Sequence, residues 1–192
     1  QEEAYQEPEQ KDEPQQAEQT YDYAGPQGGD FDANSSDIKA YCDNLYSDNP
    51  SFNWFTTKLK DEKLKSPDLE VDRTGKGGLP ELVEYMKQQK SNIIFFQLRV
   101  NTYDDEQSAR AKFIYGRFVG SGVKFMLKAK LTPNLGKIAD NFQVKHISKD
   151  LDEEMVKFNA AELAKEFLRI GGAHKPSRYD FGGGAVFSAK KK

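Results

Sequence analysis

The side chains that most often carry chemistry are scarce in this 192-residue chain, which has two histidines and one cysteine. Acid–base and nucleophilic catalysis need groups whose pKa or reactivity neighbours can tune. His146 falls in an expected strand and His174 in an expected tail, so their spacing does not pair them as metal ligands on one element. Cys42 lies on the apolar face of an expected helix, which is typical of a core residue. We therefore expect no enzymatic activity, no cofactor and no metal site.

The glycine-rich stretch Arg73–Gly78 is the other feature that suggests chemistry. A phosphate-binding P-loop has the spacing G-x-x-x-x-G-K-[ST], which lets backbone amides wrap the phosphate. Here Gly75-Lys76 is followed by Gly77, and no glycine stands at the required earlier position. The stretch is therefore expected to be a connecting loop.

Charge is distributed unevenly along the chain. The formal net charge is −3, but residues 1–30 contain nine acidic residues and one basic residue, Lys11, so the remaining residues carry a balance of +5. A basic body predicts an acidic partner. Its lysines lack the interleaved aromatic residues on which single-stranded nucleic acids stack, so we expect no nucleic-acid partner.

Cysteine content and hydropathy indicate the compartment. A single cysteine excludes an internal disulfide framework, and a reducing interior is the default for such a chain. No apolar run approaches the ~20 residues of a transmembrane helix, and the first residues, Gln1 and Glu2, are unlike a signal peptide. We expect a cytoplasmic protein without a transmembrane segment.

Two expected strands, residues 92–102 and 109–120, form the centre of the expected fold. The first carries apolar residues at every second position and also begins with apolar residues on its opposite face, Ile93 and Phe95. A strand that is apolar on both faces is typical of a central strand covered by helices on both sides. The short polar link Tyr103–Ser108 predicts a hairpin.

Helices and outer strands surround this hairpin. The expected helices span residues 38–46, 79–89, 121–131, 135–141 and 148–170, and the expected outer strands span residues 52–59, 66–72 and 142–147. Thr132-Pro133 should interrupt the third helix, because proline lacks a backbone donor. Val156 and Ile170 belong to the apolar stripe expected on the last helix. This order predicts an α/β fold with a mixed sheet of about five strands sandwiched between helices.

Three parts are expected along the chain. Residues 1–34 contain no Ile, Leu, Val or Met and are rich in Gln and Glu, which is the composition of a disordered arm. Residues 35–173 form the single domain. Residues 174–192 form a glycine-rich basic tail.

Three segments carry a resemblance to a known family: Phe113-Ile-Tyr-Gly-Arg-Phe-Val-Gly120, Lys128-Ala-Lys130 and Gly171-Gly-Ala173. Together with the expected order of elements, they resemble the actin-depolymerising-factor homology (ADF-H) domain, and most closely its coactosin group. The resemblance covers about Ser36–Ala173. It implies a non-enzymatic, cofactor-free protein of the cytoplasmic cytoskeleton that binds the sides of actin filaments.

The resemblance also implies where actin is contacted. Lys112 falls on the family's actin-contacting lysine, with Arg110 beside it; Lys124, Lys128 and Lys130 fall on the helix after the hairpin, and Lys157 and Lys165 on the last helix. Because the surface of actin is acidic, lysines on one side of a basic body would steer and orient the encounter. The alternative is that these are ordinary solvated lysines, which are common on protein surfaces.

Two departures from the family pattern leave other functions open. The stretch from Ala129 to the next strand is shorter than in the family by roughly one helical turn and contains Pro133, and the last helix is longer by about one turn. A structural subunit of a cytoskeletal assembly such as a ciliary axoneme, which docks through Gln1–Asn34 and the C-terminal tail, is therefore a second hypothesis. Binding to anionic phosphoinositide lipids is a third, since relatives of the family bind them.

Overall fold

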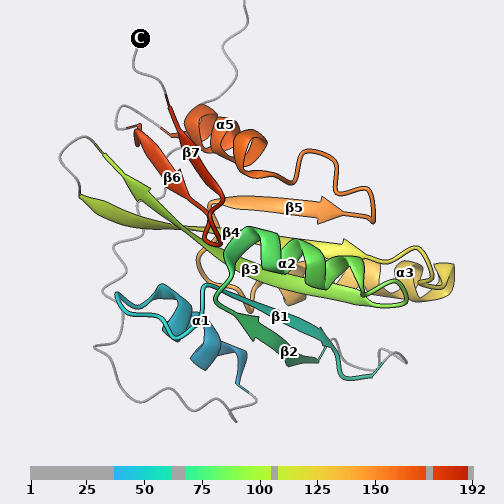
Figure 1. The fold of residues 1–192 in the computed structure, drawn as a ribbon. Helices are drawn as coiled ribbons and strands as arrows, with labels where there is room; N and C mark the ends of the chain where they lie inside the picture. The colour runs from blue at the N-terminus through green and yellow to red at the C-terminus, as the bar shows by residue number, and fades with distance from the viewer. Residues whose placement is uncertain (1–36, 62–67, 105–107, 172–174, 190–192) are drawn as a thin grey trace, which may run out of the picture.

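The structure is a computed structural model that describes residues 37–61, 68–104, 108–171 and 175–189 (Figure 1). The expected arm, Gln1–Asn34, lies outside these ranges, as does His174. Within them, seven strands form one sheet with the order β2-β1-β3-β4-β5; β6 pairs with the free part of β3, and β7 pairs with β6. The strands are β1 (Trp54–Leu59), β2 (Leu69–Gly75), β3 (Ile93–Tyr103), β4 (Ala109–Val119), β5 (Ile147–Leu151), β6 (Arg178–Asp180) and β7 (Val186–Ser188).

The central hairpin is confirmed. β3 and β4 pair antiparallel along their whole length, from Ile93 opposite Val119 to Tyr103 opposite Ala109. Only the pairing of β4 with β5 is parallel within the described sheet, so the sheet is mixed, as predicted.

The helices cover both faces of this sheet (Figure 1). They are α1 (Ile38–Tyr46), α2 (Gly78–Lys87), α3 (Phe125–Leu131), the 3₁₀ turn η1 (Thr132–Asn134), α4 (Leu135–Ala139) and α5 (Ala160–Ile170). One core cluster joins α2 and α5 to Ile94, Phe96 and Leu98 of β3. The other joins α1, α3 and α4 to Ile93 and Phe95. The prediction of a central strand that is apolar on both faces is therefore confirmed.

Pro133 interrupts the helix after β4, as predicted. The turn η1 replaces α-helical hydrogen bonding at this point. The side chains of Thr132 and Asn134 donate to the carbonyl oxygens of Lys128 and Lys130 at 3.0 and 3.3 Å, respectively. These bonds supply partners for carbonyl groups near the end of α3, where α-helical donors run out.

Residues 142–170 differ from the prediction. No strand forms at 142–146; β5 begins at Ile147, and Ser148 lies within it instead of capping a helix. The last helix, α5, begins at Ala160 behind the N-cap Asn159, so it is shorter than the helix expected at residues 148–170. Asp150, which the sequence placed in the first turn of the last helix, lies in β5 and pairs with Arg117 at 2.9 Å.

Side chains explain why residues 142–146 form no strand although they alternate apolar and polar residues. The Tyr46 hydroxyl accepts a hydrogen bond from Val144 N at 3.1 Å, and Gln97 Nε2 donates to Val144 O at 2.5 Å. His146 Nδ1 accepts from Phe113 N at 3.0 Å. These bonds take the place of a strand ladder, and the sequence pattern does not reveal them.

The C-terminal residues also differ from the expected tail. Gly171 ends α5 as predicted, but β6 then joins β3, and Tyr179 and Phe181 are fully buried in the core beneath α5. A turn with positive φ at three consecutive glycines, Gly182–Gly184, connects β6 to β7. The glycine-rich composition that resembles a tail is therefore the composition of a tight turn.

The glycine cluster at 73–78 is mostly not a loop. Arg73, Thr74 and Gly75 belong to β2, and Gly78 begins α2 with a φ of 63°. A Cβ at position 78 would lie 2.2 Å from the carbonyl oxygen of Phe181. The amides here are occupied within the protein: Gly77 N donates to Glu81 Oε2 at 2.6 Å, Gly78 N to Asn53 Oδ1 at 3.0 Å and Leu79 N to Phe181 O at 2.9 Å.

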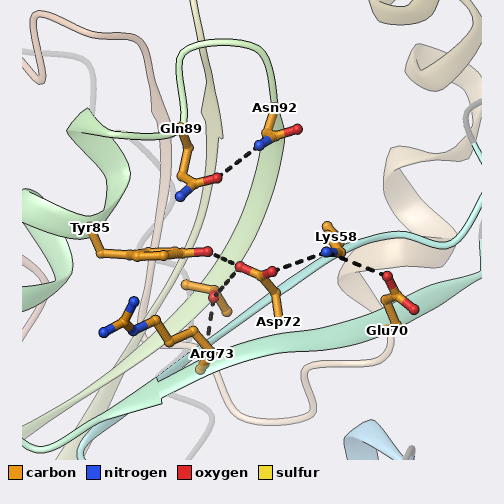
Figure 2. Close-up of polar contacts among 8 residues, drawn as sticks. Lys58, Glu70, Asp72, Arg73, Tyr85, Gln89 and Asn92 are labelled. Atoms are coloured by element: carbon orange, nitrogen blue, oxygen red, sulfur yellow. Dashed lines mark hydrogen bonds and ion pairs between the residues drawn. The ribbon is translucent and has the colours of Figure 1, made fainter.

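Charged side chains hold the edge strand β2 to its neighbours (Figure 2). Lys58 of β1 lies 3.3 Å from Asp72 and 3.6 Å from Glu70, and the Tyr85 hydroxyl of α2 donates to Asp72. The Arg73 guanidinium lies 5.2 Å from the centre of the Tyr85 ring. Lys58 therefore serves the fold, and the charges along β2 disfavour pairing of this edge with another chain.

Candidate functional site

Two loops leave the sheet at the same end, because β4 and β5 are parallel neighbours. The loop after β4 leads into α3, and the loop after β5 leads into α5 (Figure 1). Ser121 joins them: its backbone N and its hydroxyl both donate to Glu153 Oε1, at 3.0 and 2.6 Å. These hydrogen bonds lower the pKa of Glu153 below its ordinary value, so the contact is maintained at neutral pH. We call residues 121–126 and 153–157 the end surface.

Exposed apolar side chains mark the end surface. Phe125 and Met126, in the first turn of α3, are 79% and 63% exposed, and Val156 is 64% exposed. They are the most exposed of the large apolar residues in the described part of the chain. The prediction that Val156 belongs to the buried stripe of the last helix is wrong, because this residue precedes the helix and points to solvent.

The backbone around Val156 is held in an unusual conformation. Met155 and Lys157, on either side of it, have positive φ angles of 45° and 61°. This left-handed region costs a non-glycine residue about 1–2 kcal/mol. The buried side chains of Met155 and Phe158 anchor the turn in the core. Strain of this kind is typical of functional segments, and here its effect is to present Val156 and Lys157 outward.

Lysines continue from the end surface along α3 and α4. Lys124, Lys128, Lys130 and Lys137 are all exposed, and residues 121–139 contain no acidic residue. None of these lysines forms an ion pair within the described residues. We call these four residues the lysine row.

The other expected lysines on the last helix lie in a different environment. Lys157 and Lys165 line a hollow of about 360 Å³ between β5 and α5, together with Lys149, Glu162, Glu166 and Arg169. Lys165 pairs with Glu162 at 2.6 Å and lowers the pKa of that carboxyl, and Lys149 pairs with Glu166. Much of the positive charge in this hollow is therefore already neutralised.

Arg110 and Lys112 lie far from the end surface, at the opposite end of β4. An eleven-residue strand spans ~35 Å. Arg110 is exposed, whereas Lys112 is half-buried, with its Nζ 5.9 Å from the centre of the Phe167 ring on α5. The seven residues expected at a binding surface thus form no single patch. Lys124, Lys128 and Lys130 lie along α3. Lys157 joins the end surface to the α5 hollow that also holds Lys165, whereas Arg110 and Lys112 lie apart from both.

Several candidate residues were not predicted from the sequence. Phe125, Met126 and Val156 were missed because apolar residues were assigned to the core. Lys149 was missed because it lies in an unpredicted strand, and Arg169 because the charged side of α5 had no defined partner. An apolar pair directly after Lys124, at the start of a lysine-rich helix, is the signal that could have identified Phe125 and Met126.

The scarce reactive side chains serve the fold. Cys42 is fully buried, and burial raises the pKa of its thiol to about 12. Burial and the positive charge of Lys112 lower the pKa of His146 to about 4, so its imidazole is neutral near pH 7 and accepts the hydrogen bond from Phe113. Among the described residues, no group of three His, Cys, Asp or Glu side chains is placed to hold a metal ion. No helix of the described chain has the length and hydropathy to cross a membrane.

Comparison with known proteins identifies the family. The profile described as "Cofilin/tropomyosin-type actin-binding protein" matches residues 30–160. The chain therefore belongs to the cofilin/ADF family of actin-binding proteins. The match confirms, at the level of the family, the resemblance found in the sequence. The family consists of actin-binding proteins that are not enzymes.

Within the family, the chain is similar to coactosins. Coactosin of Dictyostelium discoideum is 28% identical over 152 residues, which cover 79% of this chain and 95% of that protein. The crystal structure of coactosin from Entamoeba histolytica has a TM-score of 0.52 at 22% identity, over 68% of this chain and 87% of that one. A crystal structure of human coactosin-like protein has the same TM-score at 16% identity, over 69% of this chain and 94% of that one. At these identities the structural likeness shows the fold, which agrees with the predicted mixed α/β domain.

Proposed function

We propose that this protein binds the sides of actin filaments, without enzymatic activity, and that its end surface makes the main contact. One observation carries the proposal: the three most exposed large apolar side chains of the described chain lie next to lysines, on two segments that the Ser121–Glu153 contact joins. Phe125 and Met126 follow Lys124, and Val156 precedes Lys157. Family membership supplies actin as the partner.

The end surface has the composition of a protein interface. Apolar side chains at its centre gain free energy when a partner covers them, about 1.5–3 kcal/mol for each fully buried Phe or Met side chain. Lysines around them steer an acidic partner and fix its orientation, with a modest effect on affinity. The joined loops limit the motion that binding would otherwise have to suppress.

The remaining lysines form two further groups in this proposal. Lys128 and Lys130 extend the contact along α3. Lys112 and Arg110, at the opposite end of β4, would contact a second site on the filament, and Lys165 lies in the α5 hollow that Lys157 of the end surface also lines. Contact with the side of a filament in the cytoplasmic cytoskeleton would engage both groups of lysines.

Co-sedimentation with filamentous actin at moderate salt tests the proposal on the full-length protein. We expect the unmodified protein to pellet saturably. Phe125→Asp should weaken binding about thirtyfold or more, as for a central interface residue. Val186→Asp is the matched control, since Val186 is also a partly exposed apolar residue (43%) but lies on β7. Lys112→Ala should weaken binding by only about threefold, because Lys112 would contact the filament away from the end surface.

Each result discriminates between hypotheses. If the unmodified protein does not pellet, the filament-binding proposal fails, and a structural subunit of another cytoskeletal assembly becomes the leading hypothesis. If Phe125→Asp binds normally while Lys112→Ala does not, the filament contact lies around Arg110 and Lys112 on β4, and the end surface is not involved.

A further inference from the structure

The lysine row differs from seven other cations of the described chain in having no ion pair among the described residues. Lys39, Lys58, Lys87, Arg117, Lys149, Lys165 and Arg178 each form an ion pair there. The row consists of the N-cap Lys124 and three lysines on the fifteen consecutive helical and 3₁₀ residues that follow it, without one acidic residue among them. The adjoining Phe125 and Met126 are largely exposed. This surface therefore fits an acidic segment that also carries aromatic side chains.

The same chain contains a segment of that composition. Residues 1–30 carry nine acidic residues against one lysine, and the aromatic residues Tyr5, Tyr21 and Tyr23 stand among the acids. We propose that residues 1–30, which we call the acidic arm, dock on the lysine row of their own chain and cover Phe125 and Met126.

The connection to the domain places the arm on the correct face. The domain begins with α1, whose N-cap is Asp37. Helices α1, α3 and α4 pack on the same face of the sheet, because they share one core cluster. A flexible coil of fourteen residues, the number between Asp22 and Asp37, would span ~20 Å, and the fifteen residues of α3, η1 and α4 extend for ~22 Å. A linker of this length fits docking on the row of the same chain, for which the effective concentration would be roughly millimolar.

The α5 hollow is the weaker alternative for the same arm. It contains four cations, but Glu162 and Glu166 pair with two of them. Helix α5 also packs on the opposite face of the sheet from α1. Charge compensation and position both favour the lysine row.

Docking of the arm has a consequence for partner binding, which rests on the proposed function. Lys124, Phe125 and Met126 belong to both surfaces, so the arm and the filament compete for them. If the arm occupies the row for about 70–90% of the time, the apparent affinity for filaments falls about threefold to tenfold. Partner binding would then rise when the arm is neutralised or captured elsewhere.

Zero-length carbodiimide cross-linking of the full-length protein tests the docking directly. The reagent joins carboxylates to lysines that are in contact, and peptide mass spectrometry identifies the pairs. We expect cross-links within one molecule from arm carboxylates to Lys124, Lys128, Lys130 or Lys137, and their loss at high salt because exposed charges are screened. A full-length variant whose nine arm acids are replaced by the corresponding amides (Glu→Gln, Asp→Asn) should show amide shift changes over residues 121–139.

Two results would overturn the proposal. One is cross-linking of the arm to Lys157 and Lys165 or between molecules, in place of the lysine row. The other is unchanged amide shifts at 121–139 in the neutralised-arm variant. In co-sedimentation the neutralised arm should raise filament affinity about threefold to tenfold. If no form of the protein pellets, the proposed function fails, but the cross-links and shifts still decide whether the arm docks.

Discussion

The two helical surfaces that carry the candidate lysines lie on opposite faces of one sheet and differ in how their charge is compensated. On α5, Lys165 pairs with Glu162, and Lys149 of β5 pairs with Glu166. On α3 and α4, no acidic residue stands among four exposed lysines. The difference shows that a count of basic residues does not locate a basic surface. What matters is whether acidic side chains within reach already neutralise them.

The two faces also complete their cores by different means. Beneath α2 and α5, the C-terminal hairpin packs aromatic side chains, and glycines allow the close approach of its turn to α2. Beneath α1, α3 and α4, buried polar side chains bind the backbone of residues 142–146, with Tyr46 and Gln97 at the centre. The core beneath α1, α3 and α4 therefore depends on a titratable group, His146, whereas the core beneath α2 and α5 depends on the packing of aromatic side chains.

The largest expected effect is the loss of stability of the α1/α3 face at acid pH. The folded-state pKa of His146 is about 4, below its ordinary value near 6.5, so the unfolded chain binds the proton first. Stability is therefore fully present above pH 6.5 and is lost as the pH falls toward 4. The contribution of His146 to this loss is about 3 kcal/mol. Urea unfolding at pH 7 and pH 4.5 measures it.

His146→Asn is the control for that measurement. The Asn carbonyl oxygen can accept the hydrogen bond from Phe113 N but does not titrate. The variant should lose less stability than the unmodified protein between pH 7 and 4.5, which separates His146 from the carboxylates. Equal losses in the two proteins would show that His146 does not govern this range.

Charge reversal on each face tests the contrast between the two lysine surfaces. Lys128→Glu adds an acid to an uncompensated row, whereas Lys165→Glu adds one to a surface where two acids already pair with lysines and breaks an exposed ion pair. We expect Lys128→Glu to slow association with filaments and weaken binding about tenfold, and Lys165→Glu to weaken it by about twofold. Co-sedimentation at two salt concentrations checks this, because the first effect should shrink as salt rises. Equal effects would contradict the comparison.

The strained turn predicts opposite changes in stability and binding for one substitution. Glycine adopts the positive φ of position 157 without the penalty that a lysine incurs, so Lys157→Gly should raise the free energy of unfolding by about 0.5–1 kcal/mol. It removes a cation from the end surface and should weaken filament binding. Lys157→Ala keeps the strain and loses the same charge. The two variants should therefore differ in urea unfolding but bind filaments alike.

The smallest expected effect concerns the contact that joins the two loops of the end surface. Glu153→Ala removes the acceptor for both hydrogen bonds from Ser121, so the loops should move independently before binding. Filament affinity should fall about twofold to threefold, because binding must then order the loops. Glu153→Gln keeps an acceptor oxygen, so its filament affinity should lie between those of the unmodified protein and Glu153→Ala. Faster amide exchange at Ser121 in the Ala variant would confirm that the contact is lost.

The sequence correctly predicted the elements whose apolar pattern fits only one type of secondary structure. The β3–β4 hairpin, α1 and the interruption at Pro133 follow from periodicity and backbone chemistry. It failed where a buried polar side chain decides the backbone. The alternation at residues 142–147 is that of a strand, and only the position of Tyr46 and Gln97, distant in sequence, explains why the strand begins at Ile147.

The candidate surface was predicted less well than the fold. The lysines were found because charge is visible in the sequence, but their grouping depends on which strand ends meet at one end of the sheet. The parallel pairing of β4 and β5 brings Ser121 to Glu153, and the sequence does not reveal that pairing. The exposure of Phe125 and Val156 was missed for the same reason, since apolar residues are assigned to the core unless a tertiary arrangement places them outside.

The C-terminal hairpin has a consequence for how the chain matures. Strand β6 pairs with β3, and the partners Thr102 and Tyr179 are far apart in the sequence, with β4, β5 and α5 between them. During synthesis, the core beneath α5 stays incomplete until Tyr179 and Phe181 have left the ribosome, although most of the sheet has emerged long before. Non-local pairings of this kind close slowly and leave apolar surface exposed in the meantime. A nascent chain of this protein is therefore most prone to aggregation before residues 178–188 emerge, when the face of its sheet beneath α5 still lacks this segment of the core.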